Sequence, residues 1–180
     1  GKVSTLALGY QGGTGALIAM GALKMGVPEE DLPKLVKAWR KANPHIVKLW
    51  RDVENRVRAC LQNRIEIKFL HGIRFKYDKG YLFIQLPCGR RLAYLQPRIT
   101  EDGKIQYQGM EQGKRVWGVK DTYGGKLVEN IVQAIARDCL AEAMLKVAAA
   151  GYDICFHIHD ELIVEVPKQD ADQHLAVIRK

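Results

Sequence analysis

Hydrophobic residues recur at helical spacing after two helix-start signals in the first third of the chain. Pro28, which is followed by three acidic residues, marks the first start, and the Asn43–Pro44 pair marks the second. The apolar positions after each signal lie mostly three or four residues apart, which predicts two amphipathic helices. These positions are Leu32, Leu35, Val36 and Trp39 in the first helix, and Ile46, Leu49, Val53, Val57 and Leu61 in the second.

The period of the hydrophobic pattern shortens to about two in residues 65–118. Short apolar runs alternate with polar residues there, and turn signals separate them at Lys79–Gly80 and at residues 87–89. We therefore expect a β-rich insertion between two helical regions.

The helical period returns in residues 125–151, which read as one long helix with Gly151 as its C-cap. A polar stripe on this helix contains Gln133 and Arg137 and is typical of a solvent-exposed face. The predicted buried side consists of Leu127, Ile131, Ile135, Cys139 and Val147.

Residues 153–166 alternate like two strands of a hairpin, with His159 and Asp160 between them. A carboxylate at the tip of a tight hairpin between buried strands can be presented to a metal ion with little loss of conformational freedom. Asp is also a common turn residue, so the pattern alone leaves both interpretations open. The expected inward positions are Ile154, Phe156 and Ile158 on the first strand, and Leu162, Val164 and Val166 on the second.

The opening stretch GKVSTLALGYQGG has a glycine cluster but neither common phosphate-binding pattern. A P-loop needs a Lys directly after its last Gly, and apolar residues follow Gly15 here. A dinucleotide-binding loop needs a third small residue where Ile18 stands. Glycines and polar residues also dilute the stretch below the hydrophobicity of a signal peptide or a membrane span.

Composition narrows the range of partners. The chain of 180 residues has 28 Lys and Arg against 20 Asp and Glu, a net charge of +8 that favours nucleic acid. The basic residues are scattered rather than gathered on one amphipathic helix, which argues against a membrane surface. Four cysteines without metal-ligand spacing predict reduced thiols, so we expect a cytoplasmic protein.

Three blocks in the chain together resemble the family A DNA polymerases, the bacterial polymerase I type, most closely their phage and prophage branch. They are GKVSTLALGYQGG, YGGKLVENIVQAIARD and HDELIVEVP, in this order. The resemblance implies an α+β fold that is part of a right-hand polymerase. Residues 1–118 would form a fingers-like region with the β-rich insertion, and residues 119–180 a palm region with the long helix and a catalytic hairpin.

The resemblance implies a nucleotide site at the start of the chain. Lys2, Leu6 and Tyr10 are four residues apart, so on a helix they line one face with Lys2 and Tyr10 at its ends. By this resemblance Lys2 contacts the triphosphate and can protonate the leaving group, while Tyr10 lies at the templating end. Leu6 stands where the family commonly has Phe or Tyr. The resemblance therefore does not extend to the family's usual discrimination between nucleotide sugars.

The resemblance also assigns roles in the second region. Gln133 would contact the DNA minor groove, with Arg137 on the same polar stripe and His159 near the primer terminus. Asp160 would be the ligand of Mg²⁺ and Glu161 an auxiliary carboxylate. Two-metal phosphoryl transfer needs a second carboxylate, which the family supplies from an upstream Asp motif that residues 1–180 lack.

We therefore expect part of a DNA-directed DNA polymerase that acts on primer–template DNA and deoxynucleoside triphosphates. The isolated chain is expected to be inactive without the missing upstream segment. A non-catalytic DNA-binding remnant of a prophage polymerase is the alternative.

Overall fold

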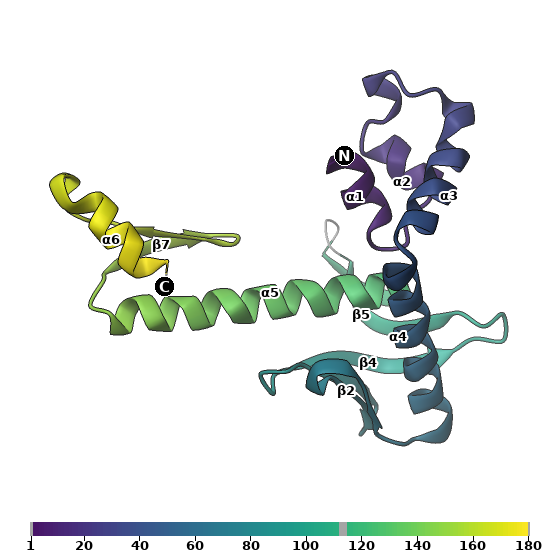
Figure 1. Cartoon of the computed structure of the whole chain (residues 1–180). Coiled ribbons are helices and arrows are strands. Elements are labelled where there is room, and N and C mark those ends of the chain that lie inside the picture. The colour runs from purple at the N-terminus through teal and green to yellow at the C-terminus, as the bar shows by residue number, and fades with distance from the viewer. Residues whose placement is uncertain (1, 112–114, 180) are drawn as a thin grey trace. The chain divides into compact units, whose positions relative to one another are not determined.

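The computed structural model describes residues 2–111 and 115–179, and these form two compact units that divide between Val132 and Gln133 (Figure 1). The fold is α+β, as the sequence predicts, and each unit is described by itself. The helices are α1 (Lys2–Leu8), α2 (Thr14–Ala19), α3 (Leu32–Ala42), α4 (Pro44–Asn63), α5 (Gly124–Ala149) and α6 (Ala171–Ile178). The strands are β1 (Ile67–Lys68), β2 (Arg74–Asp78), β3 (Tyr81–Gln85), β4 (Arg91–Ile99), β5 (Ile105–Glu111), β6 (Val116–Thr122), β7 (Ile154–Ile158) and β8 (Glu161–Val164).

Helices α1, α2 and α3 share a small hydrophobic core in the first unit. Leu8, Leu17 and Leu32 are at most 2% exposed in this core. The signal at Pro28 produces a 3-10 turn over Glu29–Asp31, and α3 itself begins only at Leu32. The predicted start at Pro28 was therefore four residues too early, because the acidic residues form the tighter turn first.

Helix α4 begins at Pro44, as predicted, and ends where Arg64 takes a left-handed conformation. Val53, Val57 and Leu61 are buried as expected, whereas Ile46 is exposed near the start of the helix. Sequence periodicity did not identify two further buried residues, Trp50 and Cys60.

The β-rich insertion is confirmed as a six-stranded antiparallel sheet with the order β1-β2-β3-β4-β5-β6. The Lys79–Gly80 turn joins β2 to β3, and both of its residues have positive φ, which suits a two-residue hairpin. Strand β6 continues to Thr122, beyond the predicted end at residue 118. One face of this sheet is buried through Phe75, Leu82, Ile84 and Tyr94.

Gly151 ends α5 as predicted, with a left-handed φ of 85°. Its N–H donates to the carbonyl of Ala148 at 3.0 Å, and the N–H of Tyr152 donates to the carbonyl of Val147 at 3.3 Å. The two hydrogen bonds form a Schellman motif, for which glycine is the usual residue.

The buried side of α5 differs from the prediction at Cys139, which is exposed, while Leu140 is buried. Leu127 and Ile131 are buried, as expected, and belong to the first unit. Val147 is also buried, but at 100° per residue it lies about 200° around the helix from Leu127. The buried residues of α5 therefore do not follow a single stripe.

The β7–β8 hairpin is present, but its strands are not buried as expected. Phe156 and Ile158 are 53% and 47% exposed, and Ile154 is half-buried. The pairing register shifts between Ile154 and Phe156, so the predicted alternation of these three residues on one face is broken. Strand β8 ends at Val164, and Val166 lies outside it.

The four thiols should differ in reactivity. Burial raises the pKa of the Cys60 thiol, whereas Cys88, Cys139 and Cys155 are exposed. Since the thiolate is the reactive form, we expect three thiols to react quickly with Ellman's reagent and the fourth only after denaturant is added. The Cys60→Ala variant should lack the slow thiol, and four fast thiols in the native protein would contradict this burial.

Tyr94 should make stability depend on alkaline pH. Burial raises the pKa of Tyr94 to about 12, although Asn130 donates a hydrogen bond of 2.9 Å to its hydroxyl oxygen. The unfolded chain loses this proton near pH 10, so the free energy of unfolding should fall by about 1.4 kcal/mol per pH unit between pH 10 and 12. Urea unfolding at pH 9 and pH 11 should show a smaller decrease for Tyr94→Phe than for the unaltered chain, and equal decreases would refute the assignment.

Candidate functional site

Lys2 and Leu6 lie on the exposed side of α1. Leu6 is 49% exposed and Lys2 is also exposed, whereas Ala7 and Leu8 face the core of the first unit. The spacing of four residues therefore places the Lys and the Leu where both are accessible to a ligand.

Tyr10 does not continue this helical face, contrary to the prediction. Helix α1 ends at Leu8, and Gln11 adopts a left-handed φ of 71° shortly after it. Tyr10 is half-buried in the intervening turn. The helix ends early because the glycines that follow favour a turn over a continued helix.

The turn at residues 9–13, which holds Tyr10, is fixed by side chains of α3 and α4. The indole N–H of Trp50 donates to the carbonyl of Gly9 at 3.1 Å. The Arg40 guanidinium donates to the carbonyls of Gln11 and Gly12 at 3.5 and 3.3 Å. These contacts provide hydrogen-bond donors for three carbonyls of the turn that follows α1 and hold the turn in place.

The same turn contacts the start of α5, which sequence reasoning missed. The side-chain oxygen of Gln11 accepts a hydrogen bond of 2.8 Å from the N–H of Gly125. A Glu54 carboxylate oxygen accepts one of 2.9 Å from the N–H of Gly124. Both acceptors satisfy free N–H groups at the helix N-terminus, where negative charge is also favoured.

Close backbone packing explains the two glycines at this junction. A Cβ on Gly125 would lie 2.4 Å from the carbonyl oxygen of Tyr10, and one on Gly124 would lie 2.1 Å from that of Trp50. The Gly-Gly pair directly before a hydrophobic helix was the signal in the sequence that could have indicated this contact.

In the second unit, Gln133 and Arg137 are exposed on α5, as their polar stripe predicts. Both terminal nitrogens of Arg137 lie 3.3–3.4 Å from the ring nitrogens of His157. A neutral imidazole accepts a hydrogen bond at only one nitrogen, so at most one of these contacts is a hydrogen bond at a time. His157 is thus the histidine near the polar stripe, and no motif had singled it out.

His159 and Asp160 form the two-residue turn between β7 and β8, as predicted. His159 has a φ of 48°, and the side chains of both residues and of Glu161 are exposed. Within residues 2–111 and 115–179, no side-chain hydrogen bond or ion pair engages Asp160 or Glu161. Both carboxylates are therefore available to an external cation.

The donor set at the hairpin fits part of a Mg²⁺ site. No group of three or more His, Cys, Asp or Glu side chains that could hold a metal occurs in the described part of the chain. Mg²⁺ is usually held by one or two carboxylates together with water and substrate phosphates. Asp160 and Glu161 can supply that minimum, with the remaining ligands coming from elsewhere.

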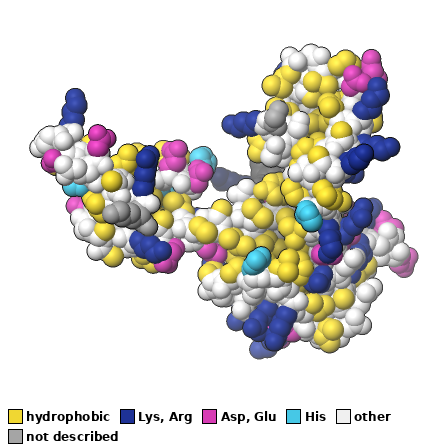
Figure 2. Space-filling view, viewed as in Figure 1, with side chains coloured by type: hydrophobic (Ala, Val, Ile, Leu, Met, Phe, Trp, Pro, Cys, Tyr) yellow, Lys and Arg dark blue, Asp and Glu magenta, His cyan; other side chains and the backbone are white. Residues whose placement is uncertain are grey.

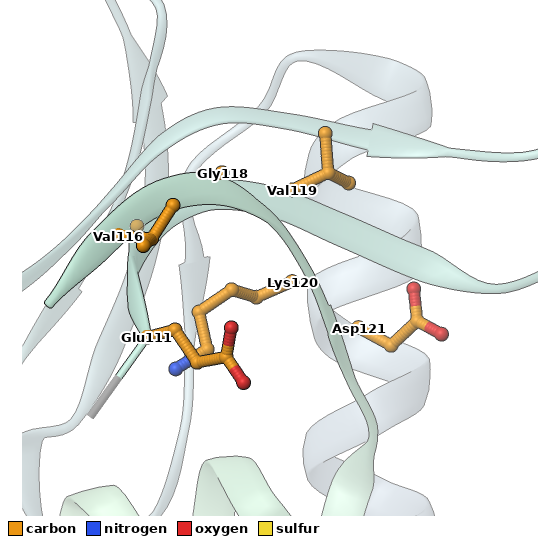
Figure 3. A pocket seen from close by; sticks show the side chains of 7 residues that line it. Glu111, Val116, Gly118, Val119, Lys120 and Asp121 are labelled. Carbon is orange, nitrogen blue, oxygen red and sulfur yellow. The ribbon is translucent and has the colours of Figure 1, made fainter. Parts of the chain in front are cut away.

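Basic side chains occur on both units, with groups over the part of the first unit where β2 and α4 lie (Figure 2). A pocket of about 300 Å³ lies on the β5–β6 hairpin, where Glu111 and Lys120 point to the same side of the ribbon (Figure 3). Lys120 donates to the carbonyl of Met110 at 3.1 Å. None of the predicted site residues lines this pocket.

The candidate residues thus fall into two groups, Lys2, Leu6 and Tyr10 in the first unit and those around Asp160 in the second. Lys2 and Leu6 are exposed within the first unit, and Asp160 is exposed within the second. Among the described residues, none of the helices has both the length and the apolar character that crossing a membrane requires.

Comparison with known proteins finds similarity to a phage DNA polymerase. The chain is 55% identical to the DNA polymerase of Bacillus phage SP02, in a match that covers 93% of the chain. The chain spans 26% of the length of that polymerase. No protein-family profile matches the chain, and neither does any solved structure.

Proposed function

We propose that this chain is the nucleotide-binding and metal-binding part of a DNA-directed DNA polymerase of family A. The observation that carries the proposal is the 55% identity to a phage DNA polymerase along nearly the whole chain. The exposed side chains of Lys2 and Leu6 on α1 and of Asp160 at the hairpin tip agree with it.

In this proposal, each group of residues has a separate task. Lys2 neutralises charge on the triphosphate and can donate a proton to the leaving group, while Tyr10 borders the base pair. Asp160, supported by Glu161, holds Mg²⁺, which stabilises charge on the reacting phosphates when bound. Gln133 and Arg137 contact the DNA, and His159 lies near the primer end.

The sharpest test is a chimera with the phage relative. The matching segment of the SP02 DNA polymerase is replaced by this chain, and Mg²⁺-dependent extension of a labelled primer is measured. We expect the chimera to extend the primer, because the rest of the polymerase supplies the second carboxylate, and the isolated chain to be inactive.

A chimera that binds primer–template DNA but does not extend it would favour the non-catalytic remnant over the polymerase. Extension by the isolated chain would instead show that its site is complete without an upstream carboxylate.

Binding of the isolated chain to primer–template DNA should be weak, independent of sequence and sensitive to salt. Each phosphate that Lys or Arg neutralises releases counterions, so log affinity should fall linearly with log salt concentration. Fluorescence anisotropy over a series of NaCl concentrations measures the slope. A flat response, or strong preference for one sequence, would contradict binding through phosphates.

A further inference from the structure

The six-stranded sheet has a second face with a different character from the buried one. Phe75, Leu82 and Ile84 are buried on the first face, where Asn130 of α5 also contacts Tyr94. Because side chains alternate along a strand, their neighbours point to the other side. We call that side the outer sheet face and define it by Lys76, Tyr81, Phe83, Arg91, Met110 and Trp117.

Two aromatic rings and a guanidinium lie together on this face. The rings of Tyr81 and Phe83 are stacked, with centroids 5.5 Å apart and planes 22° apart. The Arg91 guanidinium carbon lies 5.7 Å from the centroid of Phe83. Lys76 is paired directly opposite Phe83 on the next strand. Planar rings thus lie beside positive charge on a rigid sheet.

The β5–β6 hairpin carries a second apolar group on the same side. Tyr81 pairs with Leu95, which pairs with Gln108, so these three residues share the outer sheet face. Met110 lies two residues beyond Gln108 and pairs with Trp117, so both point to that face. Met110 is 55% exposed and Trp117 is 58% exposed.

The charge of this region favours an anionic ligand. Residues 65–118 contain ten Lys and Arg against five Asp and Glu, which accounts for most of the net charge of the chain. Lys76 lies 3.9 Å from the Asp78 carboxylate, but both side chains are about half exposed. An exposed pair of this kind contributes little, so phosphate can replace the carboxylate as the partner of Lys76.

We propose that the outer sheet face binds single-stranded DNA, with bases stacked on Tyr81, Phe83 and Trp117 and phosphates held by Lys76 and Arg91. Exposed rings interleaved with basic side chains are what such binding requires. The centre of a protein–protein interface is instead depleted in Lys, whereas Lys76 lies directly opposite Phe83 here. The choice of DNA rests on the proposed function, since a polymerase works on a template with a single-stranded part.

The test measures binding of the isolated chain to a fluorescein-labelled oligothymidylate of about 12 nucleotides, a length within the usual site size. Tyr81→Thr and Trp117→Thr keep β-propensity but remove the rings. Each should weaken binding by about 5-fold to 150-fold, the range measured for loss of one stacked base. Arg91→Gln should weaken binding and lower the salt dependence.

Matched controls lie on the same elements. Val116 is 57% exposed beside Trp117 but points to the opposite face, so Val116→Thr should bind normally. Lys104→Gln removes one positive charge in the β4–β5 turn and should weaken binding less than Arg91→Gln does. Arg91 is exposed, so Arg91→Gln should fold normally. This variant therefore still tests the proposal if a variant that lacks one of the rings fails to fold.

Affinity unchanged in Tyr81→Thr, Trp117→Thr and Arg91→Gln, or lowered equally in Val116→Thr, would overturn the proposal. It would also be overturned if the ring variants changed the oligomeric state rather than DNA binding, because the face would then join copies of the chain. Primer extension by the chimera is measured separately. If the chimera extends primers but the variants bind oligothymidylate as tightly as the unaltered chain does, this inference alone is refuted. If the chimera does not extend primers but the variants lose affinity for oligothymidylate as expected, the proposed function alone is refuted.

Discussion

Replacing Gly125 by Ala should destabilise the first unit by about 3 kcal/mol, the upper end of the usual cost of overpacking. Within a helix, Ala is ordinarily more stable than Gly by about 1 kcal/mol. At this position the added Cβ would lie 2.4 Å from the backbone oxygen of Tyr10, and a backbone atom cannot rotate away as a side chain can. The start of α5 and the 9–13 turn would have to separate.

Urea unfolding of the purified chain measures this effect. The hydrogen bond from Gly125 to Gln11, 2.8 Å long, would be lost with the close approach, which adds to the steric cost. Gly15→Ala is the matched control, because nothing lies within 4 Å of its added Cβ and α2 is helical there. Gly15→Ala should be neutral or stabilising, and equal behaviour of the two variants would rule out the close contact.

The sequence predicted those elements whose signals are local. The start of α4 at Pro44 and the end of α5 at Gly151 depend on residues that act within one turn of the helix. The alternation between residues 65 and 118 likewise indicated the strands of the sheet, because one face of that sheet is buried.

Prediction from the sequence failed where contacts between distant segments of the chain determine the structure. Trp50 and Arg40 fix the turn that holds Tyr10, yet they lie about 30 to 40 residues further along the chain, and nothing in the periodicity links them. Cys139 was assigned to the buried side because one stripe was assumed for the whole of α5. The buried residues of α5 do not continue the stripe of Leu127 along the whole helix, so extrapolating from Leu127 gave the wrong residue.

The candidate site was likewise predicted only where its signals in the sequence are local. The hairpin with Asp160 at its tip follows from alternation and a two-residue turn, both of which are local. The contact of Arg137 with His157 joins α5 to β7 across 20 residues and was not predicted. The roles of Lys2 and Asp160 come from the resemblance to polymerases and stay predictions.

Asp160→Asn in the SP02 chimera should lower the rate of primer extension by roughly three orders of magnitude or more, the scale of losing an electrostatic element of catalysis. Asn keeps the size and the turn propensity of Asp but removes the charge that attracts Mg²⁺ in the proposed function. Because Asp160 is exposed and its side chain has no partner in the described residues, the substitution should leave folding and primer–template affinity nearly unchanged.

The matched control is Asp153→Asn, which removes the same charge just before β7, away from the hairpin tip. It should extend primers at close to the rate of the unaltered chimera, since a general loss of negative charge does not disturb a site that depends on ligand geometry. Single-turnover extension with saturating DNA separates the rate from binding. If Asp160→Asn matched Asp153→Asn in rate, Asp160 would be a turn residue without a catalytic role, and the metal would have to be held by other carboxylates of the chimera.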